Sequence, residues 1–248
     1  MTWSSGQRYL AEFLGTFGLL TAVTGGALLS LNNNISSDFD ARVLLISFAV
    51  GLGLLGMIYA FGDISGGHFN PAVTVGMLIA GRTRARDAVG YILAQATGAV
   101  VGVAVIALVA HGSATLWHQI TAPNYALASE GYFGNGSPYT VSAVSVFGLE
   151  TALTFLLVVV ILGATRTDAS AKNLAPVGIA LTLVMTNLVG IPIDGASVNP
   201  ARSFAPALLS AWFGPDRWAI QQDWIFWVAP VLGGAIAALV DLALRPKS

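Results

Sequence analysis

Cysteine is absent from this chain of 248 residues, and charged residues make up only 9% of it, against about a quarter in soluble domains. The lack of thiols excludes disulfides and thiolate metal sites. Eleven Lys and Arg nearly balance twelve Asp and Glu, so no basic excess is available to bind nucleic acid. The hydrophobic share is 55%, more than a soluble core of this size needs to bury. The composition therefore predicts an integral membrane protein with lipid as its solvent.

Apolar runs of membrane-spanning length occur six times along the chain. A bilayer core about 30 Å thick needs about 20 mostly apolar residues in each crossing helix. The six runs are Arg8–Leu31, Ala41–Gly62, Asp87–His111, Ser142–Thr165, Pro176–Ile193 and Trp224–Leu244. They predict an all-α membrane protein with six transmembrane helices, and a long polar loop over residues 112–141 connects the third to the fourth.

Two further apolar stretches are too short to span the bilayer, and each begins with the triplet Asn-Pro-Ala. One runs from Asn70 through Pro71 and Ala72 to about Ile79, and the other from Asn199 through Pro200 and Ala201 to about Leu209. Such lengths favour re-entrant half-helices. We expect the approach loops Asp63–Phe69 and Gly195–Val198 to be non-helical. Unpaired backbone at membrane depth must be covered by protein or line a wet cavity, so a cavity is implied.

The two halves of the chain resemble each other weakly. The stretch beginning at Glu12 matches the stretch beginning at Glu150 at its Glu, Thr and Phe, and the two triplets follow in the same order. This predicts a single domain over residues 1–248, built from a tandem repeat of about residues 7–111 and 142–244. Because each half crosses the membrane three times, the second repeat must be inverted relative to the first.

The positions of Lys and Arg predict the orientation in the membrane. With six crossings, both termini share one side with the Arg82–Arg86 connection and the Arg166–Asn173 loop. That side carries eight of the eleven cations, namely Arg8, Arg82, Arg84, Arg86, Arg166, Lys172, Arg245 and Lys247. We therefore expect a multi-pass protein of the plasma or inner membrane with both termini in the cytoplasm.

The triplets have a specific chemistry. Asn is a preferred N-cap and Pro is favoured at the first helical position. Once the side-chain oxygens of Asn70 and Asn199 cap the backbone, we expect their NH₂ groups to be free to donate to one oxygen atom in the lumen. Two positive helix ends at the same place would oppose cations and proton transfer. The alternative is that both residues only cap helices.

Four ionisable or polar residues lie at membrane depth. Arg202 follows Asn199 by three residues and fits a constriction that repels cations, with an interfacial anchor as the alternative. We expect Glu12 and Glu150 to accept hydrogen bonds from the backbone of the two re-entrant loops, with a proton relay as the alternative. His68 precedes the first triplet and suits lumen polarity, loop support or packing.

These features together resemble the aquaporin and glycerol-facilitator family, the major intrinsic proteins. The likeness covers nearly the whole chain and includes six spans, both triplets, the following Arg and both Glu positions. It implies a homotetramer in which each monomer has its own pore. Ser203, Ala207 and the pair Phe226-Trp227 are similar to markers of the water-selective members. The resemblance therefore favours a water channel.

The resemblance also implies a selectivity filter made by Val50, Asn187, Ala196 and Arg202. Water-selective members usually have Phe and His where this chain has Val50 and Asn187. Losing both rings is expected to widen the constriction. Our hypothesis is passive, bidirectional water conduction with leakage of a small neutral solute such as glycerol, ammonia or hydrogen peroxide.

Three other classes of protein remain open. Inverted repeats with broken helices also build secondary transporters with alternating access, although these usually carry a coupling carboxylate at the midplane. A membrane enzyme has less support, because His68, His111 and His118 lack metal-ligand spacing and no nucleophile lies beside a base. A structural junction protein with a closed pore is the third. We expect no metal, no cofactor and no nucleic acid, with water, small neutral solutes and lipid as the partners.

Overall fold

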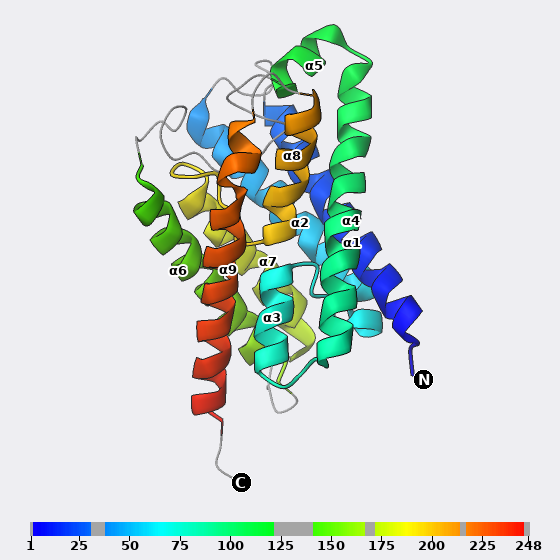
Figure 1. Ribbon diagram of the computed structural model, residues 1–248, viewed down its shortest axis with the longest axis vertical. Coiled ribbons are helices and arrows are strands. Elements are labelled where there is room, and N and C mark those ends of the chain that lie inside the picture. Colours follow the sequence, from blue (N-terminus) through cyan, green and yellow to red (C-terminus); the bar gives the residue numbers. More distant parts are fainter. Residues whose placement is uncertain (1, 31–37, 122–140, 167–171, 214–216, 246–248) are drawn as a thin grey trace.

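The computed structural model describes residues 2–30, 38–121, 141–166, 172–213 and 217–245, and within these ranges the regular structure is all helical. Figure 1 shows the helices as a bundle whose two chain termini lie at the same end. A 3₁₀ turn at Lys172–Leu174 leads into α7. The helices are α1 Ser5–Ser30, α2 Phe39–Ser65, α3 Pro71–Ile79, α4 Ala85–His111, α5 Ala114–Thr121, α6 Ala143–Ala164, α7 Ala175–Gly190, α8 Pro200–Phe213 and α9 Trp218–Ala243.

Five of the six predicted spans are helices long and apolar enough to cross a membrane, namely α1, α2, α4, α6 and α9. The sixth, α7, is shorter than its predicted range of Pro176–Ile193. It has 16 residues, which corresponds to about 24 Å of helix. It ends early because the backbone N–H groups of Ile193, Asp194 and Gly195 all turn back to the carbonyl of Gly190.

The two half-helices α3 and α8 enter the bundle from opposite ends (Figure 1), and their N-termini meet in the interior. The first has nine residues, as the sequence predicted. The second continues past the expected end near Leu209 to Phe213 and has 14 residues. Together with the six longer helices, they form the aquaporin-like membrane fold with an inverted repeat.

The first approach loop is shorter than predicted. The range Asp63–Phe69 was expected to be non-helical, but α2 continues through Ser65. Nothing in its last turn breaks a helix, and the chain first leaves the helix at Gly66, whose φ of 95° is readily available only to glycine. Only residues 66–70 therefore connect α2 to α3.

Close helix contacts occur at equivalent places in the two halves. A Cβ added to Gly98 on α4 would lie 2.3 Å from the carbonyl oxygen of Phe13 on α1. A Cβ added to Gly233 on α9 would lie 2.4 Å from the carbonyl oxygen of Thr151 on α6. These glycines let the backbones of each helix pair touch, as is common in membranes.

The half-helices pack across the two repeats. Helix α3 of the first half packs against α9 of the second, and α8 of the second half packs against α4 of the first. Gly76 on α3 and Gly234 on α9 make the first of these contacts possible, because the two backbones lie close together there. Each re-entrant element is thus held by a membrane-spanning helix from the other half.

Several of the predicted connections are only partly described. The range 112–141 was expected to be a loop, but it begins with helix α5, in which Trp117 stacks edge-on against His111 of α4 and Phe213 of α8. Residues 122–140 and the first connection at 31–37 lie outside the described residues, as do Lys247 and residues 167–171 of the fourth connection. The last span begins at Trp218, six residues before the predicted Trp224.

Candidate solute pathway

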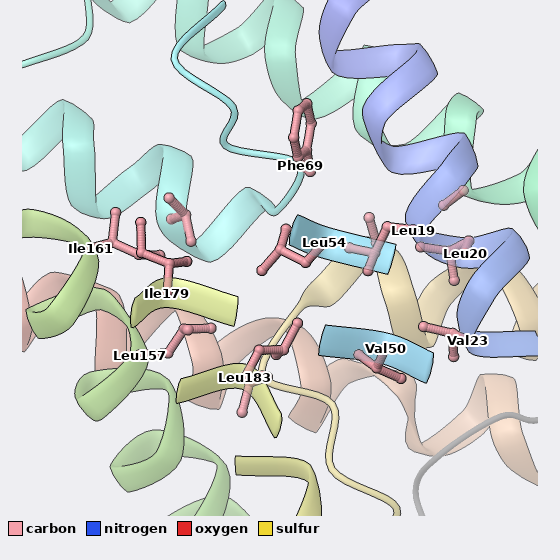
Figure 2. Close-up of a cluster of buried hydrophobic side chains, with 14 of the residues drawn as sticks. Leu19, Leu20, Val23, Val50, Leu54, Phe69, Leu157, Ile161, Ile179 and Leu183 are labelled. Carbon is pink, nitrogen blue, oxygen red and sulfur yellow. The ribbon is translucent and has the colours of Figure 1, made fainter. Parts of the chain in front are cut away.

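A cavity of about 690 Å³ lies between the helices of both halves. Figure 2 shows aliphatic side chains from α1, α2, α6 and α7 gathered around a common region. The polar groups Asn70 and Asn199 line the cavity, and Asp63, Arg82, Arg166 and Asn173 also belong to its wall. Its aliphatic wall is made by Leu19, Leu54, Ile58, Val73, Met77, Leu157, Ile161, Ile179 and Leu183.

Asn70 and Asn199 cap the half-helices α3 and α8. The Oδ1 atom of Asn70 accepts from the backbone N–H of Ala72 at 2.8 Å. In the second half, Oδ1 of Asn199 accepts from the N–H of Ala201 at 3.1 Å. Pro71 and Pro200 follow directly as the first residues of the two helices, where the missing N–H is harmless.

The amide groups of the two caps also bond across the repeats. Nδ2 of Asn70 donates to the carbonyl of Val198 at 2.7 Å, and Nδ2 of Asn199 donates to the carbonyl of Phe69 at 3.0 Å. The expectation of a wholly free NH₂ group is therefore wrong. Each amide nitrogen carries two hydrogens, so these bonds leave one hydrogen of each amide unused.

The carbonyls of Phe69 and Val198 belong to residues with an unfavourable backbone conformation. Phe69 and Val198 both have positive φ, 48° and 46° respectively, a conformation that costs energy in any residue with a side chain and most in a β-branched one. The left-handed turn immediately before each Asn directs the carbonyl toward the opposite half-helix. The strain is thus tied to the contact that joins the two loops.

Glu12 is fully buried and accepts four hydrogen bonds from the first re-entrant loop and its surroundings. Its Oε1 accepts from Ser65 Oγ at 2.6 Å and from the N–H of His68 at 2.9 Å. Its Oε2 accepts from the N–H of Phe69 and from Gln95 Nε2, both at 2.7 Å. A buried carboxylate is tolerable when its lone pairs are satisfied in this way.

Glu150 makes the equivalent contacts in the second half with fewer donors. It accepts from the N–H groups of Ser197 and Val198 at 2.7 and 2.8 Å. Asp194 supports the same loop, because its Oδ1 accepts from the N–H of Ala196 at 2.9 Å. The backbone of each loop is therefore held by a buried glutamate, and in the second half Asp194 accepts one further backbone N–H of the loop.

His68 and Gln95 complete the support of the first loop. The ring of His68 lines the cavity, and its Nδ1 lies 3.1 Å from Thr74 Oγ1. Gln95 bridges Glu12 and Thr74 from α4. Gln95 and Asp194 were not among the residues singled out from the sequence. A polar amide inside an apolar span, and a carboxylate five residues before the second triplet, were the available signals.

The expected filter residues Val50 and Asn187 extend the cavity-lining faces of their helices. Leu54 and Ile58 line the cavity at four and eight residues after Val50, and Ile179 and Leu183 line it at eight and four residues before Asn187. Positions four apart share a helix face. Val50 and Asn187 are themselves buried and do not belong to the wall of this cavity.

Arg202 and Ala196, the other expected filter residues, lie in the second re-entrant element. Arg202 is buried, with Nη2 at 3.5 Å from the carbonyl oxygen of Gly195. Ala196 has a φ of 57°, and its methyl group packs against Gly190, just beyond Asn187 on the chain. Neither residue belongs to the wall of the cavity.

A cluster of charges fixes the opposite end of α3 and was also missed from the sequence. Arg82 binds both carboxylate oxygens of Asp241 at 3.0 and 3.1 Å and donates to the carbonyl of Leu162. Arg245 binds Asp241 at 2.7 Å and the carbonyl of Ala80 at 2.8 Å. One carboxylate on α9 thereby ties together the ends of α3, α6 and α9.

Comparison with known proteins agrees with this geometry. The family model described as "Major intrinsic protein" matches residues 1–241. The chain belongs to the major intrinsic protein family.

Relatives within this family include proteins named Aquaporin Z from two bacteria. The one from Rhodopseudomonas palustris is 40% identical over 241 residues, covering 97% of this chain and 94% of the relative. The one from Photorhabdus laumondii is 40% identical over 230 residues, covering 93% and 94%. Among solved structures, the aquaglyceroporin from Plasmodium falciparum has the same fold, with a TM-score of 0.79, 22% identity and 95% coverage of each chain.

Proposed function

We propose that this member of the major intrinsic protein family is a passive, bidirectional water channel that excludes protons and ions, with a widened filter that admits small neutral solutes. Family membership and relatives named Aquaporin Z support conduction of water or small solutes in general. The observation that carries the proposal is the meeting of two oppositely directed half-helices at a cavity, each with one remaining amide hydrogen at its cap.

Water passing the two caps is held by its oxygen. The remaining hydrogens of Asn70 and Asn199 donate to that oxygen, and its own hydrogens then point along the pathway, away from the caps. The N-terminus of each half-helix adds about half a positive charge. The aliphatic wall offers no alternative hydrogen bonds, so this is the point that orients water and opposes the transfer of protons and cations.

The filter positions support the admission of more than water. Val50 and Asn187 stand where rings are usual in water-selective relatives, and both have smaller side chains than those rings. Arg202 keeps a positive charge at this level. A wider opening with an undiminished positive charge favours small neutral solutes over cations.

Stopped-flow light scattering of proteoliposomes tests this function. Vesicles containing the protein are expected to shrink faster than empty vesicles in a sucrose gradient, and equal rates would reject the proposal. Val50→Phe combined with Asn187→His restores bulk at the filter and is expected to reduce glycerol flux more than water flux. Equal reductions of both fluxes would show that these positions do not set the width.

The assembly and orientation are part of the same proposal. We place the protein in the plasma or inner membrane with both termini in the cytoplasm, because eight of its eleven Lys and Arg lie on that side of the predicted topology. We propose a homotetramer with one pathway in each monomer. Protease access to a terminal tag in sealed vesicles tests the orientation, and the mass of the detergent-solubilised particle tests the tetramer.

A further inference from the structure

The backbone of the second re-entrant loop is held by two buried carboxylates, whereas that of the first is held by one. Glu150 on α6 accepts from the N–H groups of Ser197 and Val198, and Asp194 accepts from the N–H of Ala196. Each of the two acidic residues is 1% exposed or less. Because three consecutive N–H groups of one short loop are divided between them, the two carboxyl groups lie close together, and their charges interact.

The two carboxyl groups have too few donors for two negative charges. Glu12 in the first half accepts four hydrogen bonds on its two oxygens. The four oxygens of Glu150 and Asp194 together accept three from the other residues that the structure describes. Within the same residues, Oδ2 of Asp194 is buried without a partner. Burying an ionised carboxylate is costly unless its oxygens are satisfied, and two adjacent carboxylates oppose each other's ionisation.

No ion pair neutralises Glu150 or Asp194 in the part of the chain that the structure describes. Helices α3 and α7, which pack against α6, have no ionisable side chain. The ionisable side chains on the neighbouring helices α4, α8 and α9 are Arg86, Asp87, Tyr91, His111, Arg202, Asp223 and Asp241. Of these, Arg202 reaches the loop through the carbonyl of Gly195 at 3.5 Å, and it pairs with neither carboxylate.

We propose that Glu150 and Asp194 share one proton in the folded protein, so that the stability of the second re-entrant loop depends on pH. A proton on Oδ2 of Asp194 cancels one of the two charges and lets this oxygen donate to Glu150. Loss of the proton leaves two adjacent negative charges beside residues 196–198. The same loop presents the carbonyl of Val198 to the amide of Asn70, so the proton also supports the contact between the two half-helices.

The direction of the pH dependence follows from the number of bound protons. In the unfolded chain both carboxyl groups ionise with pKa values of about 4. At neutral pH the folded protein therefore holds one proton more than the unfolded chain. The stabilisation from this proton is fully present below the unfolded pKa and decreases as pH rises. The unfolding equilibrium constant increases about tenfold for each pH unit until the pair itself ionises.

The test compares the unaltered protein with Asp194→Asn. Unfolding by SDS is followed by circular dichroism at about pH 6 and about pH 7, where the unfolded carboxyl groups are ionised. Asparagine keeps an oxygen for the N–H of Ala196 and can donate to Glu150, but it holds no titratable proton. The matched control is Asp40→Asn, which makes the same change of charge at an exposed position in the first turn of α2.

The ratio of the unfolding constant of the unaltered protein to that of Asp194→Asn is expected to rise about tenfold between these two pH values. The corresponding ratio for Asp40→Asn is expected to stay constant. A constant ratio for Asp194→Asn would show that the folded protein holds no additional proton and would overturn the inference. If the Asn variant does not insert, Asp194→Ser also removes the carboxyl group, and its ratio is judged in the same way. The measurement involves no solute flux, so its outcome is independent of the proposed channel function.

Discussion

Replacing Glu12 by Gln is expected to remove hydrogen bonds that hold the first re-entrant loop, without changing the shape of the side chain. The carboxylate faces four donors, two on each oxygen. In glutamine one oxygen becomes an NH₂ group. If this group faces Ser65, the hydroxyl can turn to accept, but the N–H of His68 loses its partner. If it faces the other way, the N–H of Phe69 loses its partner.

The size of the effect follows from this count. One buried backbone N–H without an acceptor costs about 1–3 kcal/mol, and the remaining bonds lose the extra strength that a charged acceptor gives. We therefore expect Glu12→Gln to lower the free energy of unfolding by about 2–4 kcal/mol. Water permeability is expected to fall as well, because the loop carries the carbonyl of Phe69 that holds Asn199.

Titration with SDS, followed by circular dichroism, measures the stability, and stopped-flow scattering measures the permeability. Thr24→Val is the control, because Thr24 is buried on the same helix and its hydroxyl has no hydrogen-bond partner among the described residues. The control is expected to be neutral. A Glu12→Gln protein within about 0.5 kcal/mol of the unaltered one, with unchanged permeability, would refute this account of the loop.

Three further changes test other parts of the structure. Asp241→Asn weakens both arginine pairs at the end of α3 and is expected to cost about 1–3 kcal/mol, since the carboxylate is buried and the arginines are partly exposed; an unaltered SDS midpoint would contradict this. Gly98→Ala places a methyl group 2.3 Å from a carbonyl oxygen, so α1 and α4 must separate and stability is expected to drop, whereas Gly6→Ala meets nothing within 4 Å and serves as its control. Mercurial compounds are expected not to block water flux through a thiol, because the chain has no Cys; a block reversed by reductant would show otherwise.

The arrangement of helices could be predicted from the sequence because lipid permits few alternatives. A run of apolar residues must either cross the bilayer as a helix or turn back within it. The repeated Asn-Pro-Ala triplet then identified the two helices that turn back. The lengths of α7 and α2 were less well predicted. Gly190 ends one helix through backbone bonds, and α2 continues to Gly66, and neither boundary is marked by a change in hydropathy.

The supporting residues of the site were harder to predict than the triplets. Glu12 and Glu150 stand out because a carboxylate in an apolar run must have partners. Gln95 and Asp194 serve the same loops, but their partners are distant in sequence, and a single sequence carries no record of such contacts. One N–H of the Asn70 amide and one of the Asn199 amide donate to the opposite loop. These bonds depend on the positive φ of Phe69 and Val198, which residue types alone do not indicate.

The crossed hydrogen bonds between Asn70 and Val198 and between Asn199 and Phe69 have a consequence for biosynthesis. The first half leaves the ribosome while the residues that complete its loop have not yet been made. Its half-helix α3 must therefore wait for α9 and for the carbonyl of Val198. A chain terminated after the first repeat can insert its spans, but it lacks the carbonyl of Val198 to which the amide of Asn70 donates.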